Sequence, residues 1–297
     1  MDSYLGWKID FLNPAGESAY SGPDSVGWQI MKNPVSRAIG GVCAVLLEFA
    51  DPRIRSGVWD HSVFKTDPIG RAARTGVASM VGTYGPQKGA RRIIQGVTNM
   101  HSKVKGTTPD GVEYSALDVE LLDWVYATAG YGFLMAYDRF ARPVSDADKN
   151  RFFEEGTAVS ALYGVKEKTQ SLEHFDKMLA AISPGFEPHP INTEFLKIVE
   201  TYRGTPALPQ TLQKQLVRAA VDILPREVRE KLELGSDYDL SWAGRQTVKA
   251  MARLADQIPD KTSPAALSCE RLGLPRTFLW KKPSVRARLL EELQATP

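Results

Sequence analysis

A histidine near the end of one helical segment is the residue of this chain best placed to do chemistry. His101 closes the run "VTNMH" and follows Val97 by four residues. In a helix this spacing places the imidazole ring at the edge of the apolar stripe, because residues three or four apart share one face. A ring removed from water needs a partner for at least one nitrogen. That partner is either a backbone carbonyl or a metal.

If His101 binds a metal, haem iron suits it better than zinc. A zinc site takes three or four ligands from the protein, whereas haem iron carries the nitrogens of its own macrocycle and needs only an axial residue. The other histidines are His61, His174 and His189, and none forms a clustered zinc motif with His101. Spacing alone leaves two interpretations open: a core histidine with a satisfied ring, and a haem ligand.

The composition is that of an ordinary globular protein. The chain has 297 residues, of which 43% are hydrophobic and 24% charged, and its formal net charge is +2. The charges are dispersed without a long basic tract, so nucleic acid is not an expected partner. We expect Cys43, in the apolar run "GGVCAVLLEF", to be a buried free thiol and not part of a disulfide framework.

The hydropathy pattern predicts neither a signal peptide nor a membrane span. The first residues lack a basic start and a continuous apolar core. The longest apolar stretches have at most the length of a helix and contain polar residues. These features predict a cytoplasmic protein.

The elements that would position His101 are helices. The segment 34–50 is apolar on nearly every face, which predicts a central buried helix. Further helices are expected over 87–106, closed by a glycine, and over 117–141, again apolar almost all round. Amphipathic helical segments alternate with proline-containing turns in the remainder, and no series of alternating strands appears. The sequence therefore predicts an all-α fold.

The chain divides into two parts on its composition. Residues 1–33 are rich in Gly, Pro, Ser and aromatic residues, and we expect an irregular arm that wraps the body. Residues 34–297 are expected to form a single all-α domain. Its core would span about residues 34–180, with additional C-terminal helices packed on it.

Three blocks of sequence, in order, resemble a known family. They are "DPRIRSGVWDHSVFKTDPIGRAART", "NMHSKVKGTTPDGVEYSALDVELLDWVYAT" and "AYDRFARPVSDADKNRFFEE". They are similar to blocks of the MpaB-like oxygenases, a bacterial and fungal family that includes the rubber-cleaving latex clearing proteins. The resemblance covers residues 35–164 and implies a globin-like helical core that encloses haem b. It also implies that His101 is the proximal iron ligand, which favours the haem interpretation over the core-histidine one.

The block "GRAART" resembles the arginine and threonine that face the distal side of the haem in latex clearing proteins. Arg71 and Thr75 are four residues apart, on one helical face. Arg74 occupies the place of a lysine that can cap the iron in those proteins, and a guanidinium is a very poor iron ligand. The resemblance thus implies an open or water-bound distal side, where Arg71 or Arg74 stabilises an oxygen species or holds a haem propionate. Two surface arginines at a helix start are the alternative.

One block departs from the family pattern. Family members often have Trp-Val-His in the long helix, where this chain has Trp124, Val125 and Tyr126. A phenol can donate a hydrogen bond or pass an electron and a proton, but it cannot replace imidazole as a base near neutral pH. Tyr126 is therefore either a catalytic residue of altered chemistry or an ordinary buried aromatic residue.

Further residues are expected to contact the haem. His61 lies in a matching block, where it would stabilise its loop or touch a propionate. Trp124, on the helix of Tyr126, is a second candidate for cofactor binding. Met100 and Val97, on the helix of His101, are two more.

Together these features predict a haem-b-dependent oxygenase or oxidase that acts on a small organic metabolite, with dioxygen or peroxide as the second substrate. Arg71, Arg74, Thr75 and Tyr126 are the expected catalytic residues. Two alternatives stay open, a non-catalytic haem-binding sensor or carrier and a helical protein without a cofactor. The C-terminal helices leave room for a homodimer, which the sequence does not establish.

Overall fold

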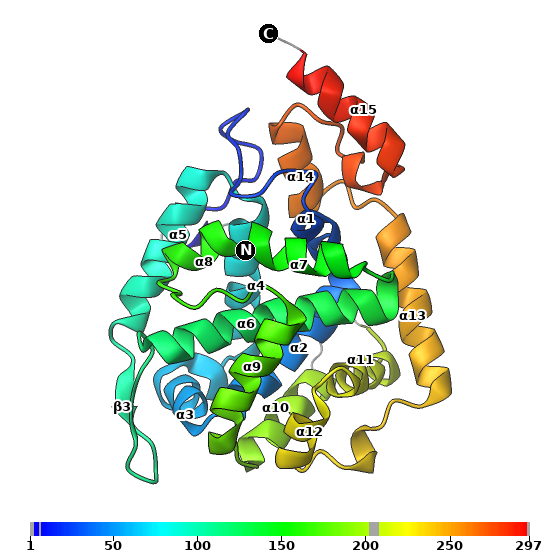
Figure 1. Cartoon of the computed structure of the whole chain (residues 1–297). Helices are drawn as coiled ribbons and strands as arrows, with labels where there is room; N and C mark the ends of the chain where they lie inside the picture. The colour runs from blue at the N-terminus through cyan, green and yellow to red at the C-terminus, as the bar shows by residue number, and fades with distance from the viewer. Residues whose placement is uncertain (1–2, 6, 202–207, 296–297) are drawn as a thin grey trace.

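The computed structural model describes residues 3–5, 7–201 and 208–295, and they form helices with two short hairpins (Figure 1). The all-α prediction is confirmed. The helices are α1 Val26–Met31, α2 Pro34–Phe49, α3 Pro52–His61, α4 Pro68–Tyr84, α5 Gln87–His101, α6 Val119–Ala136, α7 Asp146–Glu155, α8 Thr157–Leu162, α9 Leu172–Ile182, α10 Pro190–Thr201, α11 Gln210–Asp222, α12 Arg226–Lys231, α13 Trp242–Gln257, α14 Pro264–Arg271 and α15 Pro283–Gln294. The strands are β1 Ser3–Tyr4, β2 Trp7–Lys8, β3 Lys105–Thr107 and β4 Glu113–Ser115.

Two helices, α2 and α6, form the centre of the molecule and cross at a pair of glycines (Figure 1). The helix α2 starts at Asn33, whose side chain accepts hydrogen bonds from the backbone N–H groups of Val35 and Ser36. A Cβ atom added to Gly40 would lie 2.6 Å from the carbonyl oxygen of Gly132. The two backbones are thus in direct contact, and no side chain fits between them.

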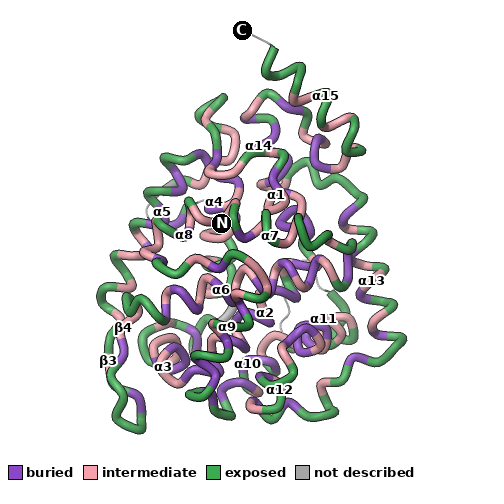
Figure 2. Tube along the Cα trace, in the orientation of Figure 1, coloured by how far each residue is buried: buried purple, intermediate pink, exposed green. Residues whose placement is uncertain are grey.

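The other helices surround this central pair (Figure 1). The helices α4 and α5 lie on one side together with the N-terminal arm, while α9 to α12 lie below and α13 runs along the opposite edge. Buried residues concentrate along the middle of the molecule, and exposed ones on α15 and the β3–β4 hairpin (Figure 2). A globin-like arrangement that encloses a haem stays a prediction.

The structure differs from the predicted boundaries around His101. The helix α5 ends at His101, whereas we expected it to continue to residue 106. The strands Lys105–Thr107 and Glu113–Ser115 pair as an antiparallel hairpin, in a segment where the sequence predicts turns and no strand. The long helix expected over 117–141 is α6 followed by a π-helical turn, Tyr137–Ala141. Glycine and proline mark turns in loops and hairpins alike, so composition does not separate the two.

The arm over residues 1–33 contains more regular structure than the sequence predicts. The strands β1 and β2 pair antiparallel, with Tyr4 opposite Trp7, and α1 lies further along the same arm. Arg271 of α14 holds the arm to the body, because its guanidinium donates hydrogen bonds to the carbonyl oxygens of Glu17 and Phe11, each at 2.8 Å. The division of the chain at residue 33 stays a prediction.

A buried ion pair joins the start of α2 to the end of α13. Lys32 Nζ donates a hydrogen bond to the backbone oxygen of Asp256 at 3.0 Å and also contacts its carboxylate. The hydroxyl of Tyr137 donates to the same carboxylate at 3.1 Å. Both charged side chains are almost inaccessible to water. Asp256 also forms an ion pair with Arg142, with 2.5 Å between Arg142 Nε and Asp256 Oδ2. Lys32 therefore depends on Asp256 for its compensation, whereas Asp256 is compensated by two cations.

Replacement of Gly40 by alanine is expected to destabilise the fold, because the added methyl group has to push α2 and α6 apart. We expect the free energy of unfolding, measured by urea denaturation, to fall by ~1–3 kcal/mol. The matched control is Gly41→Ala, where an added Cβ atom meets nothing within 4 Å. Better helix propensity should make that variant more stable by ~1 kcal/mol. Equal effects of the two substitutions would contradict a backbone contact at Gly40.

Candidate functional site

His101 is the last residue of α5, and its imidazole ring is only partly buried. Among the residues that the structure describes, no hydrogen bond reaches either ring nitrogen. Burial lowers the pKa of the ring, and the charge of Arg71 lowers it further. His101 therefore carries a neutral imidazole near neutral pH, which is the form that binds metals.

The two predicted distal arginines have different surroundings on α4. Arg71 is half-buried, which lowers its pKa, and the carboxylate of Glu48 acts in the opposite direction. The guanidinium carbon of Arg71 lies 5.8 Å from the centre of the buried Phe64 ring. Arg74 instead lies beside the residue that caps its own helix, with 3.6 Å between Arg74 Nη1 and Asp67 Oδ2. Arg71 is thus the arginine that is turned toward the interior.

Glu48, the carboxylate of α2, lies at this site but was not predicted from the sequence as a site residue. Burial raises its pKa to about 7, although the charge of Arg71 opposes this shift. The hydroxyl of Thr128, on α6, lies 3.3 Å from Glu48 Oε1. Glu48 shares its face of α2 with Gly41 and the partly exposed Val45, and a Cβ atom on Gly41 would meet nothing within 4 Å. The carboxylate therefore stands on a face of α2 that has open space beside it.

His101, Arg71 and Glu48 together form what we call the interior cluster, and they come from α5, α4 and α2. The charge of Arg71 acts on both of the other groups. A neutral imidazole, a fixed positive charge and a carboxyl group that titrates near neutral pH are complementary. Such a set can ligate a metal, stabilise a negative charge and exchange a proton.

Tyr126 and Trp124 point elsewhere from α6. The hydroxyl of Tyr126 donates a hydrogen bond to the carbonyl oxygen of Gly156 at 2.7 Å, and burial raises its pKa. Trp124 Nε1 donates to the carbonyl oxygen of Leu47 at 3.3 Å, and its ring stacks on Phe175 with 5.5 Å between the centres. Within the described part of the chain, no hydrogen bond or ring contact joins either residue to the interior cluster.

The remaining predicted residues lie around the edges of the cluster. Val97 is buried in an apolar group between α4, α5 and the arm, whereas Met100 keeps 42% of its surface exposed. His61 ends α3, and its Nε2 lies 3.2 Å from the hydroxyl of Tyr114 on the β3–β4 hairpin. Thr75 is exposed, and its hydroxyl donates to the backbone of its own helix at 3.2 Å.

Tyr4 reaches the same region from the N-terminal arm. Its side chain is only 8% exposed and packs in one apolar group with Val81 of α4 and Val97 of α5. Burial raises the pKa of its phenol, while the charges of Arg74 and Arg71 oppose the shift. A residue of the arm thus lies next to the arginines, a contact that the sequence did not predict.

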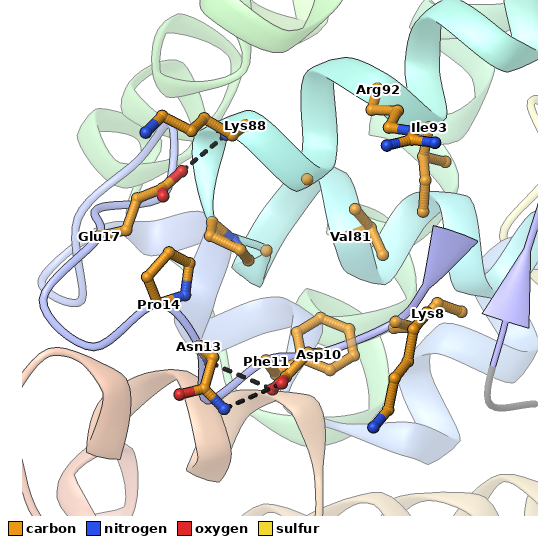
Figure 3. Close-up of a pocket in the computed structure, with 14 residues that line it drawn as sticks. Lys8, Asp10, Phe11, Asn13, Pro14, Glu17, Val81, Lys88, Arg92 and Ile93 are labelled. Atoms are coloured by element: carbon orange, nitrogen blue, oxygen red, sulfur yellow. Dashed lines mark hydrogen bonds between the residues drawn. The ribbon is translucent and has the colours of Figure 1, made fainter. Parts of the chain in front are cut away.

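A cavity of about 450 Å³ lies between the arm and the corner where α4 meets α5 (Figure 3). Its lining includes the apolar Val81 and the charged Lys8 and Arg92. Glu17, on its other side, accepts a hydrogen bond from the backbone N–H of Lys88 at 2.7 Å, which replaces the side-chain cap that α5 lacks. None of the residues that line this cavity belongs to the interior cluster.

Over residues 3–5, 7–201 and 208–295, no group of three or more His, Cys, Asp or Glu side chains is arranged to hold a metal ion. Over the same residues, every helix is too short or too polar to cross a membrane.

The raised pKa of Glu48 predicts a pH-dependent stability. The pKa of Glu48 is about 7 in the folded protein, against 4.5 for an unperturbed glutamate. The neutral carboxyl group therefore contributes its full stability to the fold below pH 4.5, and this stability is lost as the pH rises through 7. In protein free of bound cofactor, Glu48→Gln should remove this dependence and raise the free energy of unfolding at pH 8 by ~2–3 kcal/mol.

Urea denaturation at a series of pH values measures the effect of Glu48→Gln. The control is Glu154→Gln, an exposed carboxylate on α7, which should keep the pH dependence of the wild type. A pH dependence that persists in Glu48→Gln would show that burial does not disfavour the charged form of Glu48.

Comparison with known proteins gives a match to one family. The family model described as ER-bound oxygenase mpaB/B'/Rubber oxygenase, catalytic domain, matches residues 28–257. Neither a comparison with curated proteins nor one with solved structures gives a match. The matched segment runs from α1 to the end of α13 and contains the whole interior cluster. Since it covers most of the chain, this protein belongs to the family of mpaB and rubber oxygenases.

Proposed function

We propose that this protein is a haem-b-dependent oxygenase or oxidase that acts on a small organic metabolite, with His101 as the axial iron ligand. The observation that carries the proposal is the neutral imidazole of His101 beside the charge of Arg71, with no hydrogen bond to the ring among the described residues. Family membership supports the coarser part, an enzyme of the oxygenase type.

The interior cluster and its surroundings fit the chemistry of a haem. A haem can be held by a single axial histidine, and His101 is a neutral base. Its propionates call for positive charge, which either Arg71 or Arg74 can supply as the alternative to a role toward the reactants. The macrocycle needs space between apolar walls, and the face of α2 at Gly41 and Val45 offers open space beside a partly exposed apolar side chain.

The residues of the cluster would have separate tasks. When bound, haem would supply the redox chemistry with dioxygen or peroxide. The fixed charge of Arg71 would stabilise negative charge that develops on an oxygen atom of the reactants. The carboxyl group of Glu48, with its pKa of about 7, can take up or release a proton at neutral pH. The apolar side chains of α2 and α6 would exclude water and favour an apolar substrate.

The other predicted site residues have weaker support. Arg74 and Thr75 lie on the helix of Arg71, and we propose that they meet the substrate at the outer side of the cluster. Tyr126 has its hydroxyl engaged by Gly156, so its catalytic role stays a prediction. Contacts of a haem with four further residues also stay predictions: His61, Val97, Met100 and Trp124.

A non-catalytic haem-binding sensor or carrier is the second candidate. It is favoured by Tyr126, which stands where family members often have a histidine. Turnover in the presence of a reductant, dioxygen and candidate metabolites would support the enzyme, and its absence across a broad panel would support the sensor. A cytoplasmic location and a homodimer through the C-terminal helices also remain predictions.

The absorption spectrum tests the role of His101. In protein produced with a haem precursor, we expect an absorption band of stoichiometric haem. In His101→Ala this band should shift, because the iron ligand has changed, or vanish, because haem is lost. The matched control is His174→Ala, because that ring lies 3.0 Å from Glu167, away from α5, and should leave the spectrum unchanged. If both the wild type and His101→Ala are folded and colourless after reconstitution, the haem assignment is wrong.

A further inference from the structure

We propose that Tyr4 is a specificity-determining residue of this site, carried on a hairpin that has to move away before a bulky substrate can reach Arg71. The hairpin is defined as residues 3–5 and 7–8 of the arm, which include the strands β1 and β2. The role of Tyr4 in substrate specificity rests on the proposed function, whereas the control of access to Arg71 by the hairpin can be measured without haem.

The hairpin is seated on the helix that ends with His101. The side chain of Leu5, at the turn, lies against Gly96 of α5, and Leu5 Cδ1 would be 2.7 Å from a Cβ atom at that position. A larger residue at position 96 would therefore displace the hairpin. Gly96 thus gives room to the arm, which is a structural reason for a glycine in the middle of α5.

Tyr4 lies between α4 and α5, near the end of α5, where the interior cluster lies. It packs against Val97, which precedes His101 by one helical turn, and against Val81. Val81 shares a face of α4 with Arg74, seven residues earlier. The phenol therefore stands between the arginines of α4 and the arm, on the outer side of the cluster.

The hairpin is attached to the body more weakly than the rest of the arm. Further along, the arm is fixed by hydrogen bonds from Arg271 and from the backbone of Lys88. Among the described residues, by contrast, no hydrogen bond or ion pair joins residues 3–5 to a helix. Leu5 is 40% exposed and has a φ of 51°, a conformation that favours glycine over leucine. Residues 3–5 therefore rest on the helices through the apolar contacts of Tyr4 and Leu5. A two-stranded hairpin has only marginal stability of its own, so this one can open while the rest of the arm stays in place.

A disulfide between positions 5 and 96 would lock the hairpin shut. Leu5 Cβ lies 3.5 Å from the Cβ position of Gly96, within the range that a disulfide spans. The native Cys43 and Cys269 are buried free thiols, as predicted for Cys43, and burial raises the pKa of Cys269 to about 12. They are therefore slow to compete in thiol chemistry. The single variant Leu5→Cys is the matched control, since it keeps Gly96 and cannot form the bridge. In the double variant the atom that a Cβ at position 96 would meet, Leu5 Cδ1, is absent.

Access to Arg71 is read out with two arginine-selective dicarbonyls of different size, butanedione and phenylglyoxal, followed by peptide mass spectrometry. Arg226, whose side chain is 92% exposed, serves as the internal reference. We expect phenylglyoxal to modify Arg71 about five times more slowly in the oxidised double variant than in the same variant after reduction. Butanedione should be slowed less, and Leu5→Cys alone should follow the wild type.

Variants at Tyr4 separate the ring from its hydroxyl. Tyr4→Ala should raise the ratio of the phenylglyoxal rate to the butanedione rate at Arg71 by about threefold. Removal of the ring leaves space between α4 and α5 that the larger reagent can enter. Tyr4→Phe keeps the ring and should leave the ratio unchanged. Circular dichroism of each variant checks that the helices are retained.

Two results would overturn the inference. One is a failure of the bridge to form under oxidation, which would mean that the hairpin does not rest on α5. The other is a bridge that forms while the modification of Arg71 stays the same. If the bridge protects Arg71 but no haem binds, the access role stands and the proposed function fails. If haem binds and the bridge gives no protection, only the role of the hairpin fails.

Discussion

The partial burial of the charge of Arg71 is the constraint on which the interior cluster depends. A guanidinium stays protonated, so burial has to be compensated by other groups and cannot be relieved by loss of the proton. Glu48 supplies the compensating charge from α2, although burial raises the pKa of Glu48 itself to about 7. The same cation helps to keep His101 neutral. The protonation states of Glu48 on α2 and His101 on α5 thus depend on one residue of α4.

This electrostatic arrangement needs a rigid frame, and the central helices provide it. The backbones of α2 and α6 touch at Gly40 and Gly132, which fixes the approach of Thr128 to Glu48. In contrast, the hairpin at the start of the arm rests on α5 through apolar contacts. The cluster is therefore bordered on one side by the rigid pair α2 and α6, which fixes its geometry. On the other side lies the hairpin, whose weaker attachment suits the control of access that we propose.

The sequence predicted the helical parts of this arrangement and missed the long-range contacts. Apolar periodicity was enough for α2, α5 and α6, whereas the backbone contact at Gly40 and Gly132 followed only from the structure. Glu48 was visible as a lone charge in an apolar run, but its meaning depends on Arg71, and no local pattern joins the two. Tyr4 lies in an arm without periodicity, so its place beside the arginines follows only from tertiary packing. The end of α5 at His101 was missed for a local reason, because Gly106 is a strand residue here and not a helix stop.

The buried pair of Lys32 and Asp256 has a consequence for synthesis on the ribosome. The two residues are separated by 224 positions, so the lysine leaves the exit tunnel long before its counter-charge exists. Until α13 has been translated, Lys32 has to stay hydrated, and the neighbouring start of α2 cannot be buried. The central apolar helices therefore remain partly uncovered on the nascent chain, which makes this stretch a natural client for chaperones. Translation of Asp256 is what allows the charge of Lys32 to be buried.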